Sequence, residues 1–200
     1  MIVIKNLMKK YKNNLVLNIP YFNFKSGNSY MIIGCNGSGK STLIKCLLGI
    51  NKIDSGFIDL RTDNIGYIPE KYYFPDFCSI NKFLQCILDL YDLQKNNILI
   101  DYYCNKFSLD KNKSISKLSK GMMQKVLIIQ SLIHDAHLYI FDEPLNGLDS
   151  RSQKIFFDIV DELKEKDKTV IITTHYPEFY VNKYDYTLRI EKKKLVYENN

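Results

Sequence analysis

The sequence predicts an α/β domain built on a mostly parallel β-sheet with crossover helices. Short segments rich in Ile, Val and Tyr alternate with longer segments of helical periodicity, which is typical of this class. Three of the short segments, residues 31–33, 138–141 and 170–172, are apolar throughout. Strands that are buried on both faces have this composition. The length of 200 residues suits one such domain.

The expected strands and helices follow one another along the chain. Strands are expected at residues 2–4, 16–19, 30–33, 57–60, 65–68, 138–141, 170–173, 186–190 and 194–197, and helices at 40–48, 120–133 and 151–165. Ser150 and Gln153 have the S-x-x-Q spacing of a capping box, in which each side chain bonds a main-chain N–H of the first turn. We therefore expect these two residues to begin the third helix.

The segment between Glu70 and Ser119 differs in pattern from the rest of the chain. Residues 80–93 and 98–107 have helical periodicity and lack the alternation of a strand. This pattern predicts a helical insertion in the α/β core and not a separate domain. The chain, residues 1–200, is then one domain with a helical subdomain at about 71–135.

Composition and charge limit the class of function. The formal net charge is +6, but the basic residues are dispersed and are not interleaved with aromatic residues, so no nucleic acid partner is expected. Five cysteines, without a C-x-x-C spacing, argue against a disulfide framework or a zinc site and for reduced thiols in a cytosol. The N-terminus lacks a signal-peptide pattern, and no apolar run reaches the roughly 18 residues of a membrane span. Any membrane role would therefore need a partner.

Residues 34–41, Gly-Cys-Asn-Gly-Ser-Gly-Lys-Ser, fit the phosphate-binding pattern G-x-x-x-x-G-K-[ST]. The segment follows an expected buried strand and opens an expected helix, so main-chain N–H groups and the helix N-terminus can surround a phosphate. An ordinary glycine-rich turn with a lysine is the alternative. We expect ATP or GTP, with Lys40 reaching the β- and γ-phosphates and Ser41 ligating Mg²⁺. The residues expected to bind the nucleotide here are Gly34, Cys35, Asn36, Gly37, Ser38, Gly39, Lys40, Ser41 and Thr42.

Two adjacent acids end the expected strand 138–141. Asp142 would lie near Mg²⁺, and Glu143 would act on the attacking water as general base or orienting group. A strand that merely stops in a polar turn is the alternative. His175 ends the strand 170–174, at the sheet edge where ligands bind in open α/β sheets. It is either a structural histidine or, as we prefer, a catalytic residue that contacts the γ-phosphate.

The ordered set of motifs resembles the nucleotide-binding domain of ABC transporters, a family of P-loop NTPases. Residues 118–122, Leu-Ser-Lys-Gly-Met, are similar to the L-S-G-G-Q motif of this family, and Leu148 and Asp149 resemble its D-loop. His175 resembles its switch histidine, and Tyr11 stands where the family places an aromatic residue that stacks on adenine. An ordinary strand-end residue is the alternative for Tyr11. The resemblance extends from about residue 2 to residue 197.

The resemblance implies a mostly parallel sheet core with antiparallel N-terminal strands and a helical subdomain. It also implies an ATPase that uses ATP and Mg²⁺ and works in a head-to-tail dimer, with a second copy or a homologous ATP-binding subunit. Ser119 and Gly121 of one subunit would then contact the ATP of the other. A separate membrane-spanning transporter subunit would be the partner, and the chain would be cytoplasmic, on the inner face of the membrane. Exposed aromatic residues at 72–74 would dock this subunit, unless they pack locally.

Three positions depart from the family pattern. Lys120 and Met122 stand where Gly and Gln are usual, and Glu70 replaces a glutamine that contacts Mg²⁺. Glu70 remains a candidate metal ligand, and the departures are similar to those of exporter-type members. Two other functions stay open: an ABC-type ATPase that remodels a non-transport assembly, such as iron–sulfur machinery, and a regulatory subunit that binds nucleotide without turnover. The presence of Glu143 argues against the second of these.

Overall fold

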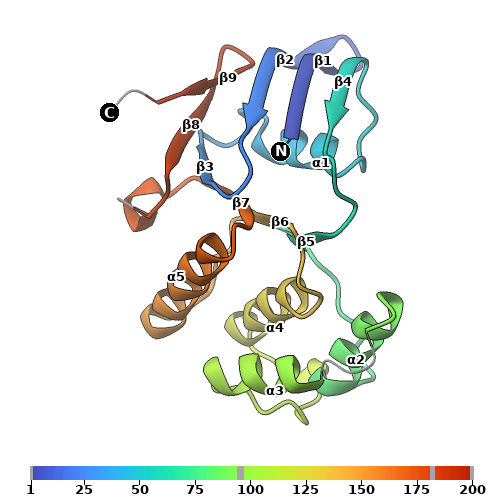
Figure 1. Ribbon diagram of the computed structural model, residues 1–200. Helices are drawn as coiled ribbons and strands as arrows, with labels where there is room; N and C mark the ends of the chain where they lie inside the picture. Colours follow the sequence, from blue (N-terminus) through green and yellow to red (C-terminus); the bar gives the residue numbers. More distant parts are fainter. Residues whose placement is uncertain (1, 94–96, 181–182, 199–200) are drawn as a thin grey trace.

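The chain forms two β-sheets and a group of helices in the computed structural model, which describes residues 2–93, 97–180 and 183–198. A three-stranded antiparallel sheet has the order β2-β1-β4, and a six-stranded sheet has the order β5-β6-β7-β3-β8-β9 (Figure 1). The strands are β1 (Ile2–Tyr11), β2 (Asn14–Phe24), β3 (Ser29–Ile33), β4 (Ser55–Asp59), β5 (Ile65–Ile68), β6 (Leu138–Asp142), β7 (Thr169–Thr174), β8 (Tyr186–Glu191) and β9 (Lys194–Tyr197).

The six-stranded sheet is parallel except at one edge. Strands β5, β6, β7, β3 and β8 pair in parallel, and β9 pairs antiparallel with β8. Because the carboxyl ends of the parallel strands meet at one edge, the loops that follow them lie close together. This arrangement, together with the antiparallel N-terminal strands, confirms the predicted fold class.

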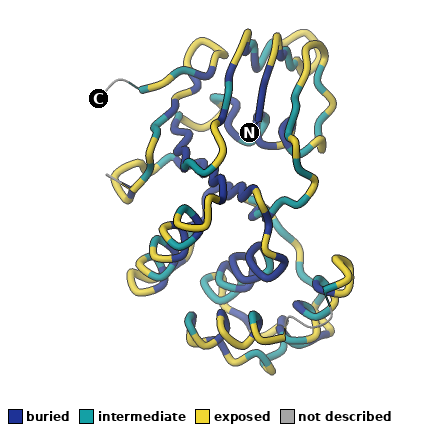
Figure 2. The backbone as a smooth tube through the Cα atoms, viewed as in Figure 1, coloured by how far each residue is buried: buried dark blue, intermediate teal, exposed yellow. Residues whose placement is uncertain are grey.

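The central sheet is buried on both faces, as its apolar segments predict. Tyr30 and Ile32 of β3 pack with the antiparallel sheet and α1 (Lys40–Leu47), whereas Met31 and Ile33 pack on the opposite side with the other helices. Successive side chains of a strand point to opposite faces, so one apolar segment contributes to both cores. In Figure 2 the middle strands are accordingly almost continuously buried, and the outer faces of the helices are exposed.

Apart from α1, the helices lie on the other side of the six-stranded sheet from the antiparallel sheet (Figure 1). They are α2 (Ile80–Leu90), α3 (Asn97–Lys106), α4 (Lys120–Leu132) and α5 (Ser150–Glu165), with short 3₁₀ helices at Ile115–Lys117 and Pro177–Tyr180. The first two occupy the predicted helical insertion. Helix α2 ends before the predicted residue 93, and residues 94–96 lie outside the described part.

Two local predictions were wrong. Helix α5 is capped by Asp149, whose side chain accepts a hydrogen bond from the N–H of Ser152 at 2.8 Å, and not by Ser150. Gln153 donates instead to the carbonyl oxygen of Leu148 at 3.2 Å, so the expected capping box does not form. Asp is as good an N-cap as Ser, and its position one residue earlier fixes where the helix begins. Strands β1 and β2 also continue far beyond the predicted residues 2–4 and 16–19, because they pair with each other along their length.

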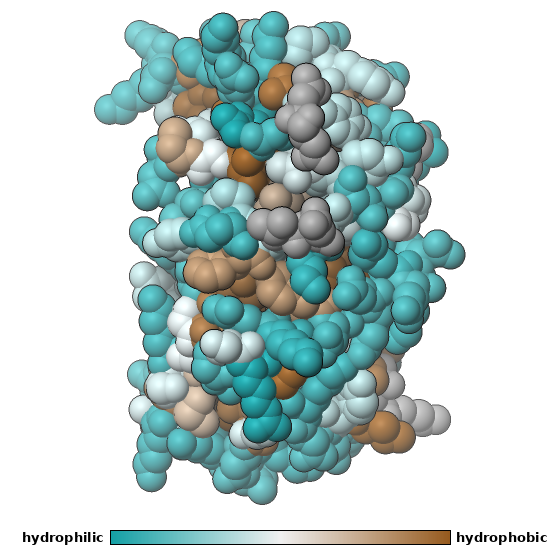
Figure 3. Space-filling view, turned by 90° about the vertical axis from the view of Figure 1, so that its left-hand side faces the viewer, coloured by the Kyte–Doolittle hydropathy of each residue, from teal (hydrophilic) through white to brown (hydrophobic). Residues whose placement is uncertain are grey.

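The surface is largely hydrophilic on the face formed by β8, β9 and α5. Figure 3 shows this face, with hydrophobic residues gathered near its middle. Among the described residues, no helix combines the length and the apolar character that a membrane span requires.

Candidate active site

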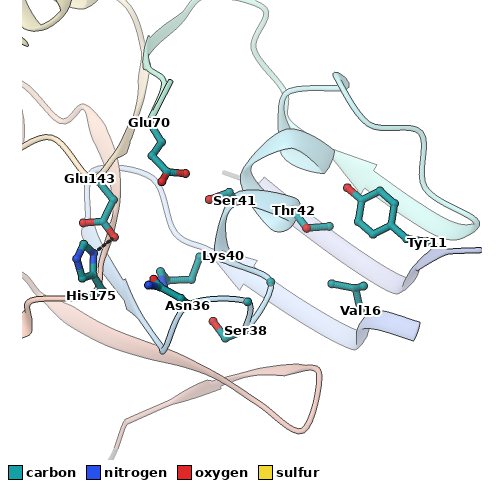
Figure 4. Close-up of a pocket in the computed structure, with 12 residues that line it drawn as sticks. Tyr11, Val16, Asn36, Ser38, Lys40, Ser41, Thr42, Glu70, Glu143 and His175 are labelled. Carbon is teal, nitrogen blue, oxygen red and sulfur yellow. Dashed lines mark ion pairs between the residues drawn. The ribbon is translucent and has the colours of Figure 1, made fainter. Parts of the chain in front are cut away.

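A cavity of about 470 Å³ opens at the carboxyl edge of the central sheet. The loop after β3, the end of β5, the end of β6 and the residue after β7 all contribute to its walls. Figure 4 shows Glu143 and His175 at one end of the cavity and Tyr11 with Val16 at the other. The lining residues are Tyr11, Val16, Asn36, Gly37, Ser38, Gly39, Lys40, Ser41, Thr42, Glu70, Glu143 and His175.

The loop between β3 and α1 has the backbone of a phosphate-binding loop. Gly37 has a φ of 81° and Gly39 a φ of 109°, values that a residue with a Cβ adopts only under strain. Gly39 is the N-cap of α1 and offers no side chain to the free N–H groups of the first turn, which also contains no acidic residue. These N–H groups are therefore available to an anion at the positive end of the helix.

The Lys40 side chain is held under this loop. Its ammonium donates to the carbonyl oxygens of Gly34 at 2.5 Å and Cys35 at 3.3 Å, and the residue is almost fully buried. None of the ion pairs among the described residues includes this ammonium, although its charge acts on the carboxyls of Asp142 and Glu143 from a distance. The Lys40 ammonium therefore lies at the phosphate-binding loop before any phosphate binds.

Asp142 lies at the end of β6, behind the cavity wall. Its side chain is almost fully buried and accepts a hydrogen bond from the Thr173 hydroxyl. Burial raises the pKa of this carboxyl above its usual value, and the negative charge of Glu70 raises it further, while the Thr173 and Ser41 hydroxyls oppose the shift. A nearby cation would favour the ionised form.

Ser41, Asp142 and Glu70 form an oxygen donor set that fits Mg²⁺. Within the described residues there is no cluster of three or more His, Cys, Asp or Glu side chains suited to a metal. Mg²⁺ does not need one, since it usually takes one or two carboxylates together with phosphate oxygens and water. Asp142 and Ser41 lie close enough for the Ser41 hydroxyl to lower the pKa of Asp142, and the charge of Glu70 also acts on this carboxyl, so the three side chains belong to one neighbourhood.

Glu143 has an unusual backbone and a close partner. Its φ is 55°, in the left-handed region, and its side chain is 8% exposed. An oxygen of its carboxylate lies 2.7 Å from Nδ1 of His175 (Figure 4). Burial raises the pKa of Glu143, and the hydrogen bond and charge of His175 work in the opposite direction. The structure thus brings together the predicted acid and the predicted histidine.

The far end of the cavity is apolar and aromatic. Tyr11 is 48% exposed at the end of β1, and its hydroxyl accepts a hydrogen bond from the Asn51 amide at 2.8 Å. The Lys9 ammonium lies 5.1 Å from the centre of the same ring. Val16 completes this wall but was not predicted, because nothing in the sequence distinguishes it from the other valines of the strands.

Ser119 and Gly121 do not line this cavity. Ser119 is the N-cap of α4 and is exposed, with its hydroxyl accepting from the N–H of Met122 at 3.3 Å. Gly121 lies against Gly147: a Cβ at position 121 would be 2.5 Å from the carbonyl oxygen of Gly147. Gly34, Cys35 and Asp142, although predicted, are also absent from the lining.

A phosphate loop, a buried acid at a strand end and a glutamate–histidine pair on a parallel sheet define a P-loop nucleotide hydrolase. The family model described as "ABC transporter" matches residues 17–146. This chain belongs to the ABC transporter ATP-binding family and is an ATPase.

Known relatives agree with this assignment. An uncharacterized ABC transporter ATP-binding protein of Methanocaldococcus jannaschii is 34% identical over 98% of this chain and 76% of its own length. A zinc import ATP-binding protein of Rickettsia bellii is 36% identical over 85% of this chain and 74% of its own length. A solved ATP-binding subunit of an ABC transporter superposes with a TM-score of 0.91 at 25% identity, covering 98% of this chain and 88% of the other.

Proposed function

We propose that this chain powers a transporter by binding ATP with Mg²⁺ and hydrolysing it beside a separate membrane-spanning subunit. Subunits of this family form dimers and pair with membrane subunits. The proposal places the chain at the cytoplasmic face of the membrane through that partner. Its main support is the presence of Lys40, Glu143 and His175 around one cavity.

Binding would begin at the phosphate loop. The main-chain N–H groups of residues 36–42 and the Lys40 ammonium contact the phosphates, while Tyr11 and Val16 contact the base. Ser41, Asp142 and Glu70 would hold Mg²⁺, which supplies charge neutralisation on the phosphate oxygens when bound. The Lys40 ammonium would exchange its bonds to Gly34 and Cys35 for bonds to phosphate oxygens.

Hydrolysis would then depend on Glu143. A water oxygen attacks the γ-phosphorus, its proton passes to the Glu143 carboxylate, and the bond to the β-phosphate oxygen breaks to leave ADP and phosphate. The raised pKa of Glu143 improves its proton affinity as a base. His175 keeps the carboxylate in position through the 2.7 Å contact and contacts the γ-phosphate from the same edge.

The second half of the ATP site would come from a second chain. Ser119 is exposed at the N-terminus of α4 and Gly121 follows in its first turn, both outside their own chain's cavity, and we expect them to contact the ATP of a neighbouring subunit. An exposed helix start without acidic residues in its first turn suits a γ-phosphate. ATP would thus hold two subunits together, and hydrolysis would release them.

The membrane partner would contact the segment after β5. Tyr73 is 100% exposed and Phe77 is 90% exposed, while Tyr72 and Phe74 pack against the helical core. Exposed aromatic side chains of this kind are enriched in protein interfaces. The name of the Rickettsia bellii relative refers to zinc import and lends no support to the exporter-type expectation, so the proposal covers transport in either direction.

The decisive experiment is the Glu143→Gln variant. It should lose ATP hydrolysis, keep ATP affinity and form a stable dimer with ATP, detected by size-exclusion chromatography with light scattering. A variant that stays monomeric at saturating ATP would contradict the dimer. Co-purification of a polytopic membrane protein with the wild-type chain, and its loss in Tyr73→Ser, would distinguish a transporter subunit from an ATPase of another assembly.

A further inference from the structure

Gln124 is a buried polar side chain with no role in the proposed attack of water on the γ-phosphorus. It lies in the second turn of α4 and is 4% exposed. Its amide nitrogen donates a hydrogen bond of 2.9 Å to the carbonyl oxygen of Pro144. Pro144 directly follows Glu143 in the chain, so this bond ends one residue from the proposed base.

Glu143 needs support from its surroundings because its backbone is strained. A left-handed conformation of a residue other than glycine costs on the order of 1–3 kcal/mol, and a following proline restricts the conformation further. The Glu143 N–H donates to the Thr173 carbonyl at 3.1 Å, and the Glu143 carbonyl accepts from Asn146 at 3.3 Å. The Gln124 bond holds the next peptide from helix α4.

Helix α4 contacts the loop after Glu143 at two further points. Gly121 lies against the Gly147 carbonyl, and the Lys125 ammonium lies 3.4 Å from a carboxylate oxygen of Asp149. Gly121, Gln124 and Lys125 have the spacing of residues on one helix face. The loop 144–149 therefore packs along the first two turns of α4.

We propose that Gln124 is a positioning residue for hydrolysis: its amide fixes the Pro144 carbonyl and so keeps Glu143 in its left-handed conformation, facing His175 and the cavity. The proposal rests on the proposed role of Glu143. It does not involve nucleotide binding, since Gln124 does not line the cavity. Loss of the bond should therefore lower kcat and leave ATP affinity unchanged.

The test compares two variants of the full chain. Gln124→Met keeps the length and most of the volume of the side chain but removes the donor. Gln130→Met is the matched control, because Gln130 of the same helix donates a similar bond of 3.1 Å to the carbonyl of Tyr67 in β5, away from Glu143. We expect Gln124→Met to reduce kcat by about 10- to 100-fold, as for a small misplacement of a catalytic group. KM and the Kd of a non-hydrolysable ATP analogue should change less than twofold, and Gln130→Met should keep its kcat.

A third variant tests the hydrogen bond itself. Gln124→Glu can donate to the Pro144 carbonyl only when protonated, and burial favours that form. The ratio of its kcat to that of Gln124→Met should therefore rise as the pH is lowered. A flat ratio, equal losses in the Met variants at 124 and 130, or a parallel rise in Kd would overturn the proposal.

A comparison with Glu143→Gln separates this proposal from the proposed function. If Glu143→Gln is inactive while Gln124→Met is fully active, only the role of Gln124 is wrong. If Glu143→Gln hydrolyses ATP at the wild-type rate, the role of Glu143 fails, and that of Gln124 fails with it.

Discussion

The close approach of Gly121 to Gly147 makes Gly121→Ala an informative substitution. At a solvent-exposed helix position without tertiary contacts, this change would stabilise the protein by up to about 1 kcal/mol, because alanine is the better helix former. Here the new methyl group would lie 2.5 Å from the Gly147 carbonyl oxygen, so main-chain atoms must move. The loop cannot yield easily, because Gln124 and Lys125 hold it on either side of this contact.

The expected magnitude follows from these two opposing effects. Overpacking costs about 1–3 kcal/mol, and a backbone contact belongs at the upper end of that range. Subtraction of the helix term leaves a net loss of about 2 kcal/mol, which lowers the Tm by about 4–8 °C in a chain of this size. Differential scanning calorimetry of the nucleotide-free protein measures this change in Tm. Lys120→Ala is the control, since Lys120 is exposed and should change the Tm little. An unchanged or raised Tm in Gly121→Ala would refute the packing argument.

Two further predictions concern the carboxyl groups. Burial raises the pKa of Asp142 in the folded chain above its ordinary value of 3.8. The folded chain therefore binds this proton more tightly than the unfolded chain does. The stability that this group contributes is present below pH 3.8 and is lost as the pH rises through the folded-state pKa. Asp142→Asn should therefore raise the free energy of unfolding of the nucleotide-free protein at pH 7 in urea titrations and abolish Mg²⁺-dependent hydrolysis; an exposed control, Asp158→Asn, should do neither. Glu70→Gln removes a neighbouring negative charge and so should lower the pKa of Asp142 while keeping basal ATP hydrolysis; loss of that hydrolysis would instead make Glu70 catalytic.

The sequence predicted the central sheet well because its strands carry the strongest signal. Segments such as 138–141 are apolar without interruption, which is the pattern of a strand buried on both faces of a sheet. The positions of the phosphate loop and of the two acids at the end of β6 were predictable for a related reason, since they come directly after apolar segments of this kind. Their convergence at one edge is a consequence of parallel pairing.

Other features depend on contacts between distant segments and have no local signal. Val16 belongs to the cavity only because β2 passes beside the phosphate loop, near Gly39. The donor role of Gln124 requires a loop 20 residues away. The cap of α5 was misassigned because Asp149 and Ser150 are both good caps, and tertiary packing decides between adjacent candidates.

The register of strand β7 limits which mutations the active site can tolerate, because this strand contacts both acids. Thr173 bonds Asp142 through its hydroxyl and Glu143 through its carbonyl, and His175 follows two residues later. Side chains of a strand alternate between faces, so a shift of β7 by one residue would turn the Thr173 hydroxyl away from Asp142 and misalign the histidine at the same time. A single-residue deletion in the turn before Thr169 should thus yield a chain that still folds around its apolar centre but has lost every polar contact that β7 gives to the acids.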